Sequence, residues 1–389
     1  MTGTSDDATE GLDDPPTDRR SNTTMTGQTK LKRFDRYLST TDCESVWLAT
    51  PPLFAWLTGG DNLVAREGEA GCAAVGYDGD ELTVLTADIE AERLADEELD
   101  DAVTVESFPW HETGLIDALC DRVDAPAAAD IDVPGFDRID VPNLTQPLTS
   151  DDVRRYRTVA TETATAVETV AEGAKPTDTE RELAARLHRE LNAKGIGSPV
   201  VLVGGEDRVQ RYRHFTPKDV SVGGYAVLTV VGVRQGQHVA VTRTVAFSNA
   251  PDWLSERYAD TCRVAATAAA ATREAGRDGG TASDVLDSIR RAYTQLGYDD
   301  EWTTHHQGGA VGYASREWLV TPDNERPIRR PLAVGYNPTV PGAKSEDTML
   351  IDDGIDVLTD TGALPTRTAE AVGFDVTVEL PDLVDATRR

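Results

Sequence analysis

The second half of the chain repeats one order of segments: two helices followed by strands. Apolar residues spaced three or four apart indicate the helices, and short apolar runs bounded by glycine indicate the strands. We expect helices over 150–171 and 177–195, strands over 225–231 and 239–247, helices over 253–275 and 283–296, and short strands between 331 and 380. The repeated order suggests an internal duplication of an α-α-β unit.

Local signals place the start of the second of these helices. Thr177 and Glu180 have the spacing of a capping box, in which the hydroxyl and the carboxylate each bond the other residue's backbone N–H. Leu183, Leu187 and Leu191 then follow on one helical face. These residues predict an amphipathic helix whose apolar side faces a sheet.

The first part of the chain divides into a tail and a domain. Residues 1–30 contain almost no apolar side chain and cannot bury a core, so we expect a disordered acidic tail there. From 31 to 147, apolar runs such as 45–49 and 82–85 alternate with helical patterns such as 88–99, which indicates an α/β domain. The remaining residues, 150–389, form a second domain, as a length of 389 residues favours.

The charge balance excludes several kinds of partner. The chain has 68 Asp and Glu against 38 Lys and Arg, a formal charge of -30. Such a surface does not suit nucleic acid, whose phosphates require an excess of basic residues. It suits a haloarchaeal protein that must stay hydrated in concentrated salt. No apolar run approaches the length of a membrane span, and the N-terminus lacks the regions of a signal peptide. We therefore expect a cytoplasmic protein with no membrane partner.

The cysteines offer no redox or zinc motif. Cys43, Cys72, Cys120 and Cys262 lie far apart, and none forms a CxxC pair. We interpret all four as small hydrophobic residues of the core.

Several short motifs occur in the order found in one known fold. They are Phe54-Ala55-Trp56-Leu57-Thr58-Gly59, Gly173-Ala174-Lys175-Pro176-Thr177 with Glu180, Arg213-His214-Phe215-Thr216-Pro217, Thr242-Arg243-Thr244, His305-His306-Gln307-Gly308-Gly309 and Ser345-Glu346-Asp347-Thr348. Together they resemble the methionine aminopeptidase, prolidase and creatinase family. The resemblance implies an α+β chain, with a C-terminal pita-bread domain, an N-terminal α/β domain like that of creatinase, and a homodimer.

The resemblance also locates the family's metal ligands, which are two Asp, one His and two Glu. The two Asp positions fall within 229–231 and 239–241, which hold no carboxylate. The His falls on Gly309 and the first Glu on Val340, so only the last ligand remains, as Glu346. One carboxylate cannot hold two metal ions. We therefore expect no metal and no cofactor. His238, His305 or His306 offer an alternative metal site, but no ligand spacing supports it.

Creatinase hydrolyses its substrate without metal, and the histidine it uses corresponds to His214. An imidazole suits this role because its pKa lies near neutrality and it both accepts and returns a proton. The resemblance thus implies His214 as acid and base, with Glu346 orienting it or a water. Each residue also has a purely structural alternative. His214 could bond the backbone at the entrance of a strand, and Glu346 could pair with Lys344 or a nearby arginine.

Other polar residues are expected in the same cleft as substrate ligands: Arg211, Arg213, His305, His306, Asn337 and Lys344. The arginines next to His214 suit a substrate carboxylate, which a guanidinium binds with two parallel hydrogen bonds. The alternative for the arginines is an ion pair with a surface carboxylate.

Three functions follow as hypotheses. The first is a metal-independent hydrolase that cleaves a C–N bond in a small amino-acid or peptide-like substrate. The second is an inactive pseudopeptidase that binds a peptide or metabolite. The third is an Xaa-Pro aminopeptidase with an atypical metal site. Function depends on the site rather than on the scaffold, so the geometry of the named residues must decide.

Overall fold

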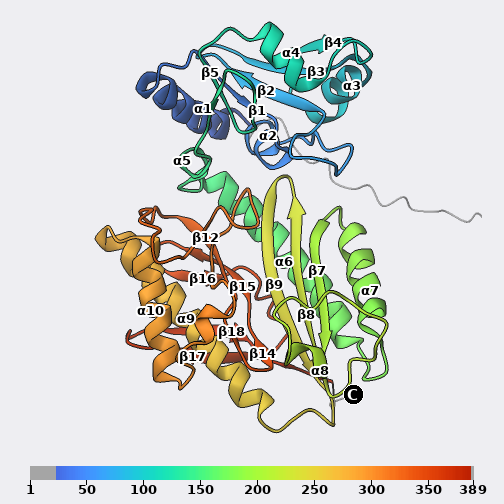
Figure 1. The fold of residues 1–389 in the computed structure, drawn as a ribbon, viewed down its shortest axis with the longest axis vertical. Coiled ribbons are helices and arrows are strands. Elements are labelled where there is room, and N and C mark those ends of the chain that lie inside the picture. The colour runs from blue at the N-terminus through green and yellow to red at the C-terminus, as the bar shows by residue number, and fades with distance from the viewer. Residues whose placement is uncertain (1–22, 387–389) are drawn as a thin grey trace, which may run out of the picture.

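The computed structural model describes residues 23–386, which form an N-terminal and a C-terminal domain (Figure 1). Helices and strands are mixed in both, which confirms the α+β class. Of the expected tail, residues 1–22 lie outside the described residues. Residues 23–30 belong instead to helix α1 (Thr23–Thr40). The aliphatic stem and ammonium of Lys30 are buried there, so this part of the expected tail contributes to the fold.

The N-terminal domain contains a six-stranded sheet in the order β4-β3-β2-β1-β5-β6. Its strands are β1 (Ser45–Leu48), β2 (Ala73–Tyr77), β3 (Leu82–Ala87), β4 (Thr104–Phe108), β5 (Ala127–Ala129) and β6 (Asp137–Arg138). Its helices after α1 are α2 (Pro51–Thr58), α3 (Asp88–Arg93), the π-helical turn η1 (Leu94–Glu98), α4 (Leu115–Arg122) and α5 (Pro142–Thr145). β1 pairs parallel with β5 and antiparallel with β2, as expected for an α/β domain with a mixed sheet.

The first half of the C-terminal domain is a pair of helices on a four-stranded sheet. The elements are α6 (Ser150–Glu172), α7 (Glu180–Asn192), β7 (Gly197–Gly205), α8 (Glu206–Val209), β8 (Tyr225–Arg234) and β9 (Gln237–Ala246). β8 and β9 form the predicted hairpin, with Gln235 and Gly236 at positive φ in its turn. A strand from the end of the chain, β19 (Val384–Asp385), joins the sheet, whose order is β19-β9-β8-β7, and α6 and α7 pack on it (Figure 1).

The second half repeats this arrangement. Its helices are α9 (Leu254–Asp278), α10 (Ala282–Gln295) and the turn η2 (Glu301–Thr303). Its strands are β10 (Gly308–Ala310), β11 (Trp318–Leu319), β12 (Leu332–Tyr336), β13 (Thr339–Val340), β14 (Ala343–Lys344), β15 (Asp347–Ile351), β16 (Ile355–Val357), β17 (Thr366–Glu370), β18 (Thr377–Pro381) and β19 (Val384–Asp385). Five of them form the sheet β11-β10-β12-β15-β16, against which α9 packs, with α10 on α9.

The two halves meet where β9 runs beside the start of β15. The backbone N–H of Thr242 donates to the carbonyl of Glu346 (2.8 Å), and the N–H of Ala240 donates to Thr348 Oγ1 (2.9 Å). Arg243 lies beneath this junction and is fully buried. The junction places the motif around Thr242 next to the motif around Glu346.

Two predicted helix starts shift slightly. The capping box of α7 uses Thr179 and Glu182, not Thr177 and Glu180. Glu180 instead accepts hydrogen bonds from the N–H groups of Gly205 and Lys218, which fixes the entrance of α7 against the sheet. For α6 the sequence suggests Ser150 as the N-cap, whereas the N-cap is Thr149, which shares a capping box with Asp152.

A buried ion pair joins the domains. Lys30 Nζ lies 3.0 Å from Asp152 Oδ1, and Tyr313 donates to the same oxygen at 2.7 Å. Burial lowers the pKa of Lys30 to about 8, against the attraction of Asp152. Burial also opposes ionisation of Asp152, but the charge of Lys30 and the hydrogen bonds of Thr149 and Tyr313 outweigh it and lower its pKa to about 2. Both partners are therefore charged at pH 7.

This pair predicts an acid-dependent loss of stability. Because the folded pKa of Asp152 lies below its ordinary value of 3.8, its contribution is complete above that pH and is lost as the pH falls towards 2. The shift corresponds to about 2 kcal/mol. We expect urea unfolding in constant salt to show Asp152→Asn as less stable than wild type at pH 7. The gap should shrink by about 1.5 kcal/mol near pH 2.5. A gap that does not change with pH would contradict the ion pair.

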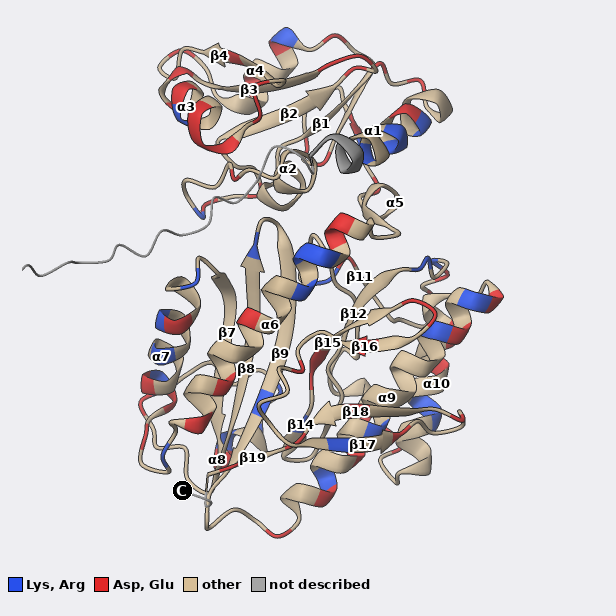
Figure 2. Cartoon of the chain, turned by 180° about the vertical axis from the view of Figure 1, so that it is seen from behind, with Lys and Arg blue, Asp and Glu red and all other residues tan. Residues whose placement is uncertain are grey.

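Charged residues are concentrated on the outer helices, whereas few occur on the central strands (Figure 2). Among residues 23–386, no helix is both long and apolar enough to cross a membrane.

Candidate functional site

Three histidines from two loops converge in the C-terminal domain. His214 lies between α8 and β8, and His305 and His306 lie between η2 and β10. The Nε2 atoms of His214 and His305 are 3.2 Å apart, and the ring centroids of His214 and His306 are 6.2 Å apart. His214 from the first half of the domain and His305 and His306 from the second half thus form one cluster, which we call the histidine cluster.

The hydrogen bonds determine the tautomer of His305. Its Nδ1 lies 2.6 Å from the carbonyl oxygen of His306, which only accepts, so Nδ1 carries the hydrogen. In the neutral ring Nε2 is then an acceptor, and His214 must donate its Nε2–H across the 3.2 Å contact. The Nδ1 atom of His214 is consequently left with its lone pair.

The surroundings keep the cluster neutral. Burial, with the nearby charge of Lys344, lowers the pKa of His305 to about 3. Burial and the charge of Arg316 lower the pKa of His306 to about 4. For His214, which is exposed, burial of part of the ring and Lys344 lower the pKa while Glu346 opposes them. All three imidazoles are therefore mainly uncharged at neutral pH.

Glu346 is held by two cations. Lys344 Nζ lies 3.0 Å from Oε2, Arg316 donates to Oε1 at 2.8 Å, and Thr242 donates to Oε2 at 3.0 Å. Burial would raise the pKa of this carboxyl group, but the charges of Lys344 and Arg316 outweigh it and lower the pKa to about 2. Lys344 also reaches Thr229 Oγ1 at 3.4 Å. We call these residues the ion trio: Lys344, Glu346 and Arg316.

The chain's sequence matches the model of one family. Residues 154–353, half of the chain, match metallopeptidase family M24. The chain belongs to the M24 family. No curated protein matches this M24 chain.

Solved structures agree with the fold of this M24 member. The dipeptidase PepE from Mycobacterium ulcerans has a TM-score of 0.69 at 17% identity and covers 94% of this chain and 99% of its own. The prolidase from Pyrococcus horikoshii has a TM-score of 0.68 at 19% identity, covering 86% and 98%. The Xaa-Pro dipeptidase from Bacillus anthracis has a TM-score of 0.67 at 15% identity, covering 92% and 99%. At such identities the likeness shows the fold alone, which is the predicted pita-bread fold with an N-terminal domain.

The other predicted substrate ligands of the M24 chain differ in position. Arg213 donates to Glu301 at 2.7 Å, which ties the loop of His214 to the turn before His305. Arg211 is exposed. Asn337 is buried after β12, and its Oδ1 has no hydrogen-bond partner among the described residues. For Arg213 the ion-pair alternative is therefore the one observed, while a substrate role for Arg211 and Asn337 stays a prediction.

Sequence reasoning missed one residue of the site, Arg316, and assigned different partners to two others. Arg316 reaches Glu346 from the loop between β10 and β11, and the sequence around it carries no signal for this contact. Glu346 was expected to orient His214, but its hydrogen bonds within the described residues go to the two cations and Thr242. The partner of His214 is His305, which the sequence placed only among the substrate ligands.

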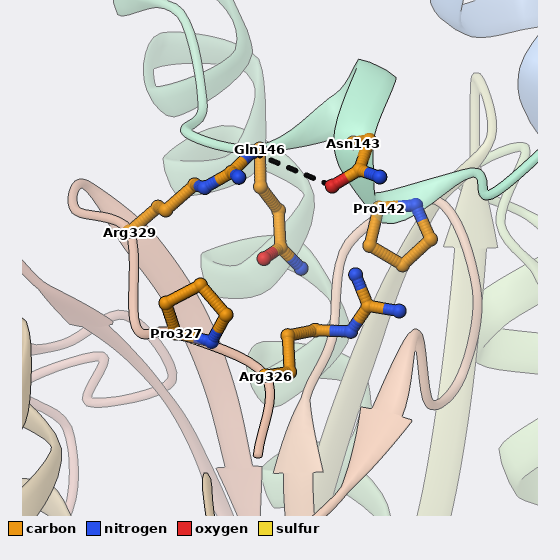
Figure 3. Close-up of a pocket in the computed structure, with 6 residues that line it drawn as sticks. All are labelled: Pro142, Asn143, Gln146, Arg326, Pro327 and Arg329. Carbon is orange, nitrogen blue, oxygen red and sulfur yellow. Dashed lines mark hydrogen bonds between the residues drawn. The ribbon is translucent and has the colours of Figure 1, made fainter. Parts of the chain in front are cut away.

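A small pocket lies at the junction of the domains, away from these residues. It is lined by Pro142, Asn143, Gln146, Arg326, Pro327 and Arg329 (Figure 3). Arg329 donates to Asn143 there, and none of the six residues belongs to the histidine cluster or the ion trio. We interpret it as a packing gap between α5 and the loop before β12.

Proposed function

We propose that this M24 chain is a metal-independent hydrolase that cleaves a C–N bond in a small amino-acid or peptide-like substrate with a carboxylate. The observation that carries the proposal is the 3.2 Å contact between Nε2 of His214 and Nε2 of His305. It supplies a neutral imidazole with a defined tautomer next to two cations.

The residues near Glu346 do not fit the paired metal ions of the family. Such a pair needs several carboxylate and imidazole ligands around a shared water. Here Lys344 and Arg316 already neutralise the carboxylate, and Lys344 Nζ is buried between Glu346 and Thr229. The single carboxylate that remains at these positions is thus already paired with both cations and offers no free ligand to a pair of metal ions. We therefore assign no step to such a metal pair.

The histidine pair can move the protons that hydrolysis requires. Nδ1 of His214 takes a proton from water as the water oxygen bonds to the substrate carbonyl carbon. The imidazolium so formed returns that proton to the leaving nitrogen as the C–N bond breaks. His305 accepts the Nε2–H of His214 throughout and is fixed by its own bond to the His306 carbonyl. It holds the ring in place, as a buried acceptor does in other histidine-dependent hydrolases.

The ion trio supplies positive charge that stabilises the negative groups of the substrate and of the transition state. An ammonium has three donors, and Glu346 and Thr229 engage two of the three on Lys344. Lys344 and Arg316 together exceed Glu346 by one positive charge. That excess favours a substrate carboxylate and the negative oxygen that develops in the transition state. In a chain with a formal charge of -30, this local excess of positive charge is opposite in sign to the overall charge.

A hydrolysis screen tests the proposal. Dipeptides, N-acyl amino acids and guanidino acids are incubated in high salt with the wild-type protein, and the released amine is measured. We expect turnover of at least one class. A ligand that raises the melting temperature yet stays intact would instead support a pseudopeptidase. The unpartnered buried atoms Asn337 Oδ1 and Ser345 Oγ favour ligand binding of either kind.

A further inference from the structure

The histidine cluster has the composition of a metal site that the family does not use. The ligand nitrogens of His214, His305 and His306 all lie within 4.8 Å of one another. Three imidazoles with an open fourth position are a known ligand set for zinc. The five positions that correspond to the family's metal ligands all lie outside this cluster.

The distances suit one ion. With Zn–N bonds of about 2.0–2.1 Å and tetrahedral angles, two ligand nitrogens lie about 3.3 Å apart. The Nε2 atoms of His214 and His305 lie 3.2 Å apart without any ion. A zinc ion bound to both Nε2 atoms would leave their separation almost unchanged, and the hydrogen of His214 would move from Nε2 to Nδ1. His306 is exposed, and its ring is stacked on His305 with centroids 4.3 Å apart, so its side chain can turn towards the same point.

The groups that orient the histidine rings also suit a metal site. A histidine that binds a metal usually donates its other ring N–H to a carbonyl or carboxylate, which orients the ring. His305 does this through Nδ1 to the His306 carbonyl at 2.6 Å. The loop of His214 is fixed in turn, because Arg213 binds Glu301 in the turn that precedes His305. Both loops are thus held so that the Nε2 atoms face each other.

We propose that His214, His305 and His306 bind one divalent transition-metal ion of the zinc type, and that its binding inhibits hydrolysis. The inhibition rests on the proposed function: a metal on His214 takes the imidazole out of proton transfer. Borderline ions should be preferred over Mg²⁺ or Ca²⁺, because imidazole nitrogen suits the former and oxygen the latter. The nearby Lys344 and Arg316 repel any cation, so binding should be reversible by a chelator.

Titration of metal-stripped protein tests the site. Isothermal titration with Zn²⁺, and visible absorption with Co²⁺ as a tetrahedral probe, should both show one site per chain in the wild type. His305→Ala and His306→Gln should each weaken binding at least about tenfold. His306 is exposed, so its replacement leaves the core intact. His111→Ala is the matched control, since His111 is exposed in the other domain, and it should bind as wild type.

Several outcomes would overturn the site. One is that the wild type shows no saturable binding. Another is that wild type, His305→Ala and His306→Gln bind equally, which is the result expected of adventitious binding to the acidic surface. Activity separates the two proposals. Inhibition by one equivalent of Zn²⁺, reversed by chelator, supports both. Activation by Zn²⁺ keeps the site but refutes metal-independent hydrolysis. Binding without any turnover refutes the hydrolase alone.

Discussion

Replacing His214 with alanine should lower kcat/KM for the best substrate by about 10²- to 10⁴-fold, the usual contribution of a general acid–base group. The ring is exposed, so the fold should survive its loss. His305→Ala should cost less, because it removes only the acceptor that fixes the tautomer of His214. Rates are measured in constant salt, with circular dichroism to verify folding.

His188→Ala provides the control for this experiment. His188 is exposed on α7, where its Nδ1 meets Ser198 Oγ at 2.8 Å, and it should retain the wild-type rate. If His214→Ala kept the wild-type rate, the histidine cluster would not be the acid and base of the reaction.

Arg243→Met should cause the largest loss of stability. The guanidinium is fully buried and donates to Glu168 (3.1 Å), Asp347 (2.9 Å) and the Thr359 carbonyl (2.6 Å). These charges raise its pKa against the effect of burial, so it is always protonated. Its removal leaves two buried carboxylates without a counter-ion, which costs about 3–5 kcal/mol. Urea unfolding in constant salt measures the loss.

Arg138→Met is the matched control, because Arg138 pairs with Glu69 and Asp132 at the surface of the N-terminal domain. Exposed ion pairs of this kind contribute about 0–1 kcal/mol. Equal losses in the two variants would show that the junction between β9 and β15 does not depend on Arg243.

The sequence predicted the architecture well where signals are local. The helices of the C-terminal domain and the β8–β9 hairpin follow from apolar spacing and glycine, and their bounds differ from the structure by a few residues. The capping box was misplaced because Thr177 with Glu180 and Thr179 with Glu182 both match the pattern. Only the tertiary bonds of Glu180 to Gly205 and Lys218 decide between them.

The site was less predictable because its contacts are long-range. The motifs located His214 and Glu346, and the ion pair of Lys344 with Glu346 was among the alternatives considered. The contact of His214 with His305 joins residues 91 positions apart, and the contact of Arg316 with Glu346 joins two loops. No periodicity or spacing specifies such contacts, since they depend on how the two halves of the domain dock.

The rate of hydrolysis in the presence of a strong chelator distinguishes a metal-independent from a metal-dependent enzyme. Protein that has been stripped of metal and assayed in high salt with the best substrate of the screen should retain its full rate with excess chelator. We expect this because His214 carries the proton transfers, and Lys344 and Arg316 balance the negative charge that develops on the substrate oxygen. Activity that disappears with chelator and returns with Mn²⁺ or Co²⁺ would contradict it.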